Sequence, residues 1–219
     1  MQCTWSRTGD GRAPVRVVPD GCIDIVWTEG LGTQVVGPNT RAFLVGLAPD
    51  TRVAGVRLLP GGAPPLLGVD AVSLRDARVA IDSVWGDEGL ALAQALDEDD
   101  DRAATLLAAL ADRAPGAAAP DPLVRVAVAR LADPEADVAA LAYELGVSER
   151  QLRRRFERAV GYGPKRLSRV LRLGYALDAA RAGEQLGRVA ADAGYVDHAH
   201  FAHDCRELAG VAPSALLAA

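Results

Sequence analysis

The sequence predicts an α+β protein, with a small antiparallel sheet or partial barrel and helices in its N-terminal half and only helices in its C-terminal half. Short runs rich in Val, Ile, Leu and Trp fill residues 15–59 and alternate with Gly, Pro, Asn and Asp, which is typical of short strands joined by turns. From about residue 82 the apolar residues recur at helical spacing. Residues 114–122, APGAAAPDP, have the composition of a linker. We therefore expect an N-terminal domain at residues 1–113 and an all-α domain at residues 123–219.

Five extended segments are expected in the N-terminal half, at residues 15–18, 22–28, 34–36, 42–47 and 52–59. The cluster PGGAPP that follows them ends the strand pattern, because proline cannot donate a hydrogen bond to a strand ladder. The N-terminal half is therefore expected to change from strands to helices after this cluster.

Two helices are expected next, one beginning near Asp82 and one at residues 101–113. Their apolar stripe belongs either to the core of the protomer, which we favour, or to a dimer interface. It comprises Leu90, Ala93, Leu96, Leu106, Leu107 and Leu110. The acidic run at residues 97–101 is either a solvated turn, which we favour, or a cap that stabilises the dipole of the second helix.

The composition is that of an ordinary globular protein of 219 residues, enough for two modest domains. No apolar run approaches the roughly 18 to 20 residues of a transmembrane helix, and the start lacks the charge order of a signal peptide, so we expect a cytoplasmic protein without membrane partners. Cys3, Cys22 and Cys205 are widely spaced and form no CxxC pair. They predict neither a disulfide framework nor a zinc ribbon.

The net charge of −5 is unevenly distributed along the chain. Residues 1–120 carry 10 basic and 16 acidic side chains, whereas residues 121–219 carry 14 and 13. Residues 148–172 alone hold nine basic side chains against Glu149 and Glu157. Because the field near a surface depends on local arrangement, this stretch predicts a concentrated cationic patch.

Residues 137–160 have the pattern of a helix-turn-helix unit, in which a small residue lets two helices approach and a glycine permits the turn. Ala142 is the small residue, and Gly146 follows four residues later. Ser148 is a good N-cap for the second helix, whose inward stripe contains Leu152 and Phe156.

At 100° per residue, the face of this second helix opposite Leu152 carries arginines. We call this the arginine face; it comprises Arg150, Arg153, Arg154 and Arg158. Such a face can be merely solvated, but arginines without acidic partners at helical spacing repel one another. Arginine is also the preferred side chain for reading guanine in the major groove, so the face predicts DNA binding.

The same pattern recurs downstream, with Ala190 followed four residues later by Gly194. The turn is expected to be one residue longer here, and Asp197 is the expected N-cap of the next helix. Its inward stripe comprises Phe201, Cys205 and Leu208, and its outward positions are Ala199, Ala202, His203 and Arg206.

A helix from Pro164 to about Ala182, with Gly183 after its end, is expected to join the two units. Nineteen residues span roughly 28 Å, comparable with the ~34 Å between successive major grooves on one face of B-DNA. Gly174 inside this helix costs about 1 kcal/mol relative to Ala and is expected to mark close packing or a bend.

With these motifs, residues 123–219 resemble the DNA-binding domain of the AraC/XylS family of transcription regulators. The most specific part is AADAGYVDHAHF at residues 190–201, followed by GVAPS at residues 210–214; GYGP at residues 161–164 closes the first unit in the same way. The resemblance implies two helix-turn-helix units joined by a linker helix. The sequence departs from the family at His203 and Cys205, where Arg and Phe are common, which weakens the cationic contact and the core.

The resemblance also implies base contacts by Arg150, Arg153 and Arg154 in the first unit and by residues 198, 199, 202 and 203 in the second. The helical angles agree except at His198, which they place beside the core. The predicted DNA-contact set comprises Ser148, Arg150, Gln151, Arg153, Arg154, Arg158, His198, Ala199, Ala202, His203 and Arg206.

The first unit is expected to dominate phosphate binding, because residues 187–219 carry only two arginines against four acidic side chains. The arginines are Arg188 and Arg206, and the acidic residues are Asp192, Asp197, Asp204 and Glu207. This asymmetry predicts that Arg154→Ala weakens DNA binding far more than His203→Ala.

The N-terminal half resembles an uncharacterised domain often found before AraC-type DNA-binding domains. The resemblance rests on VPDGCIDIVW at residues 18–27, VGP at residues 36–38 and GVRLLPG at residues 55–61. It implies a domain that senses a signal or mediates dimerisation. Asp20, Asp24 and Arg57 are the candidate ligand-binding residues, although turn and strand-edge roles are favoured for each.

All three histidines fall within residues 198–203, but only His200 and His203 share a helix face, so no metal site is expected. No cofactor is expected either. The expected partners are double-stranded DNA, a small-molecule effector, a second copy of the chain, and RNA polymerase if the protein activates transcription. The alternative is a small-molecule-binding protein or enzyme whose helical half is structural, but no recognisable catalytic constellation supports it. A steep fall of DNA affinity with salt would separate the two classes.

Overall fold

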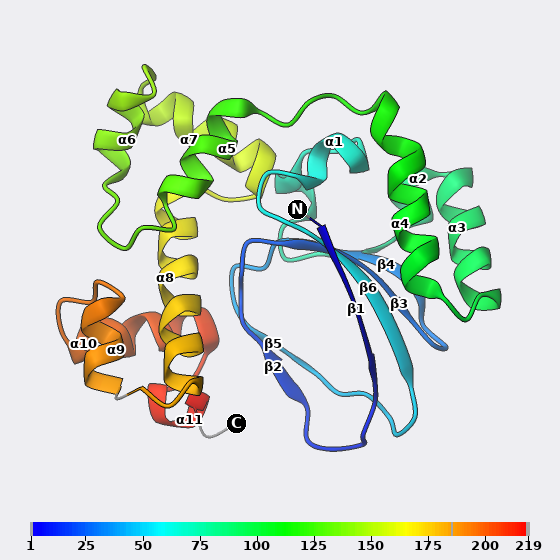
Figure 1. Cartoon of the computed structure of the whole chain (residues 1–219), viewed down its shortest axis with the longest axis horizontal. Coiled ribbons are helices and arrows are strands. Elements are labelled where there is room, and N and C mark those ends of the chain that lie inside the picture. Colours follow the sequence, from blue (N-terminus) through cyan, green and yellow to red (C-terminus); the bar gives the residue numbers. More distant parts are fainter. Residues whose placement is uncertain (1, 185, 218–219) are drawn as a thin grey trace.

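One five-stranded antiparallel sheet lies in the N-terminal half of the chain (Figure 1). The computed structural model describes residues 2–184 and 186–217. The strands lie in the order β1 (Gln2–Thr8), β6 (Arg52–Leu58), β3 (Ile23–Thr28), β4 (Gly32–Val36) and β7 (Arg78–Ala80). In β3, Ile23, Ile25 and Trp27 are buried and alternate with half-buried residues, as expected for a strand with one face on a core.

A second sheet of two short strands, β2 (Val15–Val17) and β5 (Phe43–Val45), lies on the side of the N-terminal half that faces the C-terminal helices. Arg16 of β2 donates from Nη1 to the carbonyl of Ala209 at 2.9 Å. The amide of Ala42, next to β5, donates to the carbonyl of Leu208 at 2.7 Å. These strands therefore connect the N-terminal half to the C-terminal helices.

All five expected strands are present, but β1 and β7 were not expected. The proline cluster also does more than end the strand pattern, because it begins helix α1 (Ala63–Leu67). Pro64 and Pro65 occupy its first turn, where a missing backbone N–H costs nothing. A short 3₁₀ turn, η1 (Ala71–Leu74), follows before β7.

Three helices pack with this sheet: α2 (Asp82–Trp85), α3 (Asp87–Glu98) and α4 (Arg102–Arg113). Leu96, Leu106 and Leu110 are buried in one core with the strands. The expected stripe is wrong at Leu90 and Leu107, which are 50% and 42% exposed. The inward face of α3 instead comprises Gly89, Leu92 and Leu96.

The acidic run before α4 has protein partners. The Asp101 carboxylate accepts a hydrogen bond from the amide of Ala104 and caps α4. Asp97 Oδ1 accepts from the indole N–H of Trp27 at 2.7 Å, and Asp99 accepts from the hydroxyl of Thr105. The expectation of a merely solvated turn is therefore corrected to one that caps a helix and anchors a core side chain.

Past α4 the chain forms a 3₁₀ turn, η2 (Ala114–Gly116), and then crosses in extended form to α5 (Pro122–Arg130). The side chain of Asp121 caps α5 through the amides of Leu123 and Val124. Helices alone follow: α6 (Val138–Glu144), α7 (Glu149–Val160), α8 (Pro164–Arg181), α9 (Leu186–Asp192), α10 (His198–Asp204), a π-turn η3 (Cys205–Ala209) and α11 (Pro213–Leu217).

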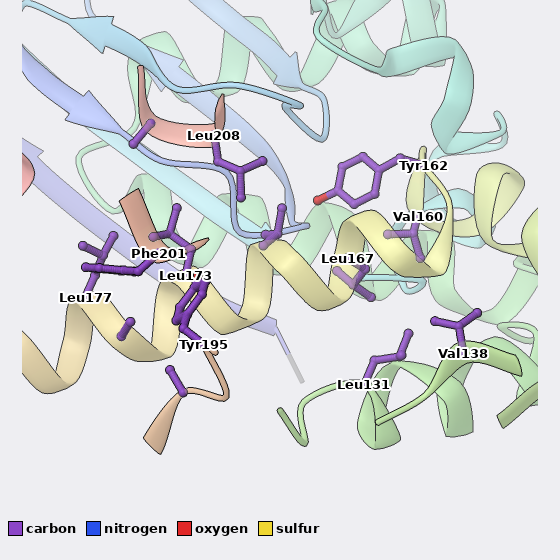
Figure 2. Close-up of a cluster of buried hydrophobic side chains, with 14 of the residues drawn as sticks. Leu131, Val138, Val160, Tyr162, Leu167, Leu173, Leu177, Tyr195, Phe201 and Leu208 are labelled. Atoms are coloured by element: carbon purple, nitrogen blue, oxygen red, sulfur yellow. The ribbon is translucent and has the colours of Figure 1, made fainter. Parts of the chain in front are cut away.

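Helix α8 runs through the core of the C-terminal half (Figure 2). At one end Leu167 packs near Val138 and Val160, and further along Leu173 and Leu177 pack near Phe201. The helix ends before Gly183, which has φ +93°, as the sequence predicted. The expectation that Gly174 marks close packing is wrong, because a Cβ there would meet no atom within 4 Å. In the part of the chain that the structure describes, no helix is long and apolar enough to cross a membrane.

Candidate nucleic-acid interface

Both helix-turn-helix units turn at a glycine, and the second turn is one residue longer than the first, as the sequence predicted: the N-cap follows the glycine by two residues at Ser148 and by three at Asp197. Gly146 and Gly194 have φ +68° and +74°, the left-handed conformation that glycine adopts at low cost. After each glycine, an amide bonds back to the carbonyl of the small residue that permits the approach. Val147 donates to Ala142 at 3.0 Å, and Tyr195 donates to Ala190 at 2.9 Å.

A capping box begins α7. The amide of Gln151 donates to Ser148 Oγ at 3.3 Å, and Gln151 Oε1 accepts from the amide of Ser148 at 2.9 Å. The predicted N-cap at Ser148 is confirmed. Both side chains also belong to the predicted DNA-contact set, and the structure gives each of them a role within the helix.

The buried stripe of α7 holds the helix in the core and leaves the arginine face exposed. Leu152, Phe156 and Val160 are at most 1% exposed. The four residues of the arginine face are all exposed, as is Arg155 on the neighbouring side. This arrangement confirms the helical angles inferred from the sequence.

The arginine face has acidic partners that the sequence analysis did not foresee. Arg153 Nε donates to Glu157 Oε1 at 2.8 Å, one turn along the helix. Arg158 Nε donates to Asp70 Oδ2 at 3.0 Å, although Asp70 belongs to the N-terminal half and precedes Arg158 by 88 positions in the chain. Among residues 2–184 and 186–217, neither Arg150 nor Arg154 has a carboxylate partner within 4 Å, so these two arginines carry the uncompensated charge of the face.

Several other cations of the predicted patch are bonded within the protein. Arg169 of α8 bonds the carboxylate of Asp204 at 2.7 Å and that of Glu207 at 3.2 Å. Arg166 donates to the carbonyl of Thr40 at 2.8 Å. The bond from Arg169 lowers the pKa of Glu207 below its ordinary value. Fewer of the nine basic side chains are therefore free to bind an anion than the sequence predicted.

The second unit begins α10 with the expected N-cap, since the Asp197 side chain accepts from the amide of His200 at 2.7 Å. His198, Ala199, His203 and Arg206 are exposed, and His198 thus lies where the family resemblance, not the angular argument, placed it. The expectation for Ala202 is wrong, because its side chain is 5% exposed.

The burial of Ala202 has a packing reason. The seven-residue helix α10 contacts both α8 and α9, so its buried face is wider than one stripe. Phe201, Cys205 and Leu208 are fully buried, as the sequence predicted, and Asp204 is buried beside Arg169. Burial raises the pKa of the Cys205 thiol to about 11.

The histidines contact protein groups in this unit. The His200 ring meets the Tyr195 ring edge to face, with centroids 5.0 Å apart. His203 Nε2 lies 3.3 Å from Glu207 Oε2. Within the described residues, no three His, Cys, Asp or Glu side chains are grouped so as to hold a metal ion.

The three candidate ligand-binding residues of the N-terminal half are brought together as an ion-pair cluster. Arg57 binds Asp24 through two nitrogens at 3.0 and 2.9 Å and Asp20 at 2.8 Å. Burial raises the pKa of Asp24, and the bonds from Arg57 act in the opposite direction. The guanidinium of Arg57 is thus occupied by the other two members of the set.

The surface where the N-terminal half meets α7 was not predicted. The 3₁₀ turn η1 packs against α7. Arg75, just after η1, donates from Nη1 to the carbonyl of Gly161 at 3.4 Å. Asp70, just before η1, holds Arg158. No local pattern could have found Asp70 and Arg75, because their partners lie more than 80 residues away in the chain.

Comparison with known proteins identifies two families along the chain. Residues 124–219 match the family described as "Helix-turn-helix domain", and residues 1–80 match the family described as "Domain of unknown function (DUF6597)". No curated protein matches the chain.

Three solved structures are similar to this chain. An apo variant of ToxT from Vibrio cholerae has a TM-score of 0.50, with 14% identity over 98% of this chain and 96% of its own. Unsaturated fatty acid-bound ToxT from Vibrio cholerae has a TM-score of 0.46, with 14% identity over 99% and 94%. The C-terminal domain of AraT, a response regulator from Geobacillus stearothermophilus, has a TM-score of 0.42, with 20% identity over 45% and 85%. At these identities the likeness concerns the fold alone.

Proposed function

The chain belongs to the AraC/XylS family of DNA-binding transcription regulators, and from this premise we propose that its two helix-turn-helix units read adjacent major grooves of double-stranded DNA. We propose that it acts in the cytoplasm, by sequence-specific binding and not by catalysis. DNA is the proposed partner of α7 and α10.

The observation that carries this proposal is the pair of glycine turns, at Gly146 and Gly194, in the two helix-turn-helix units that α8 joins. Each turn is followed by a capped helix with exposed outward residues, α7 in the first unit and α10 in the second. The 18 residues of α8 span about 27 Å, against the ~34 Å that separates successive major grooves on one face of B-DNA. The joining helix therefore has a length that suits recognition of two neighbouring grooves.

Within α7, Arg150 and Arg154 are the strongest candidates for reading bases. Both are exposed, and neither has a carboxylate within 4 Å in the described part of the chain. A guanidinium without a partner is free to form the bidentate contact to guanine O6 and N7, which is worth about 1 to 3 kcal/mol of discrimination. Arg153 must first release Glu157, an exposed pair that is worth little.

The second unit is proposed to contribute fewer phosphate contacts than the first. Two of its acidic residues, Asp204 and Glu207, are neutralised by Arg169 and do not repel DNA as free charges would. Its exposed cationic side chains are Arg188, paired with Asp192, and Arg206. Shape and apolar contacts by Ala199 and the histidines are therefore proposed to matter more in this unit.

The N-terminal half is proposed to modulate DNA binding through its contact with α7. Support comes from η1, which packs on α7, and from Asp70, which holds Arg158 of the arginine face. A small-molecule effector or a second copy of the chain that shifts η1 would change which charges of α7 are available. RNA polymerase is a further proposed partner if the protein activates transcription.

The test is a DNA-binding titration of the wild type, Arg154→Ala, His203→Ala and the control Arg12→Ala, at several salt concentrations. Arg12 is an exposed arginine of the N-terminal half, 85% exposed, so its loss matches the change in net charge. We expect Arg154→Ala to weaken binding to the preferred duplex by roughly 10-fold or more, and His203→Ala by much less. Equal losses in Arg154→Ala and Arg12→Ala would contradict a base-reading role for α7.

A further inference from the structure

A groove of about 570 Å³ lies between the start of α7, the start of α8 and Arg75, the residue that follows η1. Its walls carry five basic side chains and two glutamates. The basic residues are Arg75, Arg150, Arg153, Lys165 and Arg166. Val138, Tyr162 and Pro164 form apolar parts of the wall, which strengthen the field that the charges produce inside the groove.

Two of the five cations are already paired with a carboxylate. Arg153 is held by Glu157, and Arg166 is held by the carbonyl of Thr40 and by Glu207. The other three, Arg75, Arg150 and Lys165, have no carboxylate within 4 Å among the residues that the structure describes. All three are exposed, so the groove presents free positive charge to solvent.

Arg75 is the unexpected member of this set, because it belongs to the N-terminal half. Its position is fixed from both sides: η1 packs on α7, and the Arg75 guanidinium donates to the carbonyl of Gly161 at the end of α7. The backbone of this loop is fixed further by Asp76, whose carboxylate accepts from the amide of Thr40 at 2.6 Å. The Arg75 side chain is exposed, but its bond to Gly161 fixes its position beside α7.

We propose that Arg75, together with Lys165, binds a backbone phosphate of the same duplex that α7 reads, next to the base contact proposed for Arg150. The N-terminal half then forms part of the DNA interface and does not only regulate it. A phosphodiester fits the groove because these three cations, from three separate segments, line it, and neither glutamate of its walls lies within 4 Å of their charged nitrogens. Such a contact fixes the register of the protein on DNA and carries no sequence information. This inference rests on the proposed function.

The experiment measures how the affinity for a random-sequence duplex depends on salt, in the wild type, Arg75→Gln, Arg75→Lys and the control Arg12→Gln. Each phosphate contact adds about 0.9 to the slope of log affinity against log salt concentration. We expect Arg75→Gln to lower the slope by about 0.9, so that its affinity deficit shrinks about 3.5-fold between roughly 50 and 200 mM salt. Arg75→Lys keeps the charge and is expected to keep the slope, and Arg12→Gln is expected to leave it unchanged.

The outcomes separate this inference from the proposed function. If the wild type binds no duplex, the proposed function fails. If the wild type binds but Arg75→Gln keeps the wild-type slope, DNA binding stands and the role of Arg75 is overturned. A glutamine can still donate to the Gly161 carbonyl, so a loss of affinity in Arg75→Gln without a change of slope would mark a structural role and would also overturn the inference.

Discussion

Two glycines that end successive helices should respond differently to the same substitution, because only one of them touches the N-terminal half. Gly146 follows α6 with φ +68°, and Gly161 follows α7 with φ +94°. A Cβ at Gly146 would meet no atom within 4 Å. A Cβ at Gly161 would lie 2.4 Å from Pro38 Cγ and 3.1 Å from the carbonyl oxygen of Ala71. Gly146→Ala thus measures backbone strain alone, whereas Gly161→Ala adds a clash with the N-terminal half.

The expected magnitudes follow from these contacts. A left-handed conformation costs a non-glycine residue about 1 to 2 kcal/mol, and this term applies to both variants. Overpacking typically costs about 1 to 3 kcal/mol, and it applies at Gly161 only, since a proline ring and a backbone oxygen yield poorly. We therefore expect a loss of about 1 to 2 kcal/mol for Gly146→Ala and about 2 to 5 kcal/mol for Gly161→Ala.

Urea denaturation measures the difference directly. All three tryptophans, Trp5, Trp27 and Trp85, lie in the N-terminal half, so fluorescence follows that half while far-UV circular dichroism follows the helices of both. In the wild type the two transitions should coincide, because the halves are docked. Equal losses for Gly146→Ala and Gly161→Ala would refute the reasoning, since they would mean that the N-terminal half does not press on the end of α7.

Three further predictions concern single positions. Gly174→Ala should raise the free energy of unfolding by about 1 kcal/mol in a urea titration, because the new methyl group meets no atom within 4 Å and the helix propensity improves; a destabilised variant would show that the glycine is required. Asp70→Asn should change stability by less than about 1 kcal/mol, since its ion pair with Arg158 is exposed, yet steepen the salt dependence of DNA binding by about 0.9 as Arg158 becomes free; an unchanged slope would place Arg158 away from phosphate. Arg169 lowers the pKa of Glu207, so this ion pair stabilises the fold at pH values above the ordinary carboxyl pKa of 4.5. The stabilisation is lost as the pH falls through the lowered pKa. The urea midpoint should therefore fall more in the wild type than in Glu207→Gln when the pH is lowered from neutral to below about pH 4.

The strands that sequence reasoning missed share one physical property, because both lie at an edge of the five-stranded sheet. Strand β1 pairs only with β6, and the three-residue β7 pairs only with β4. An edge strand gains its hydrogen bonds from one distant partner and buries little of its own surface, so its sequence carries a weak alternation signal. The central strands β3 and β4 bury residues on a regular alternation and were predicted, as was β6, which has a continuous run of buried residues.

Local interactions explain why α7 and α10 could be placed from the sequence. A helix cap or a turn glycine acts on residues only a few positions away, so the sequence alone can predict it. This holds for the caps at Ser148 and Asp197 and for the turn glycines Gly146 and Gly194. Ala202 was misplaced because the width of a buried face depends on how many helices pack against it, and α10 contacts two.

Long-range pairings account for what the sequence could not show at the candidate interface. Arg158 looked uncompensated because its partner, Asp70, is 88 residues away. Arg169 was predicted as part of the cationic patch, but the fold places it against Asp204 and Glu207. Charge counted along a chain therefore overestimates the free charge of a folded surface, and here only part of the predicted patch remains available.

Selection of bound sequences from a random duplex library at physiological salt, with the wild-type full chain, tests the central claim most directly. Recognition by α7 and α10 in adjacent grooves predicts an enriched motif of two blocks whose centres lie about one helical turn, roughly 10 base pairs, apart. The same selection with Arg154→Ala should lose the block read by α7. Enrichment of a single block in the wild type, or binding without any enriched motif, would contradict tandem recognition.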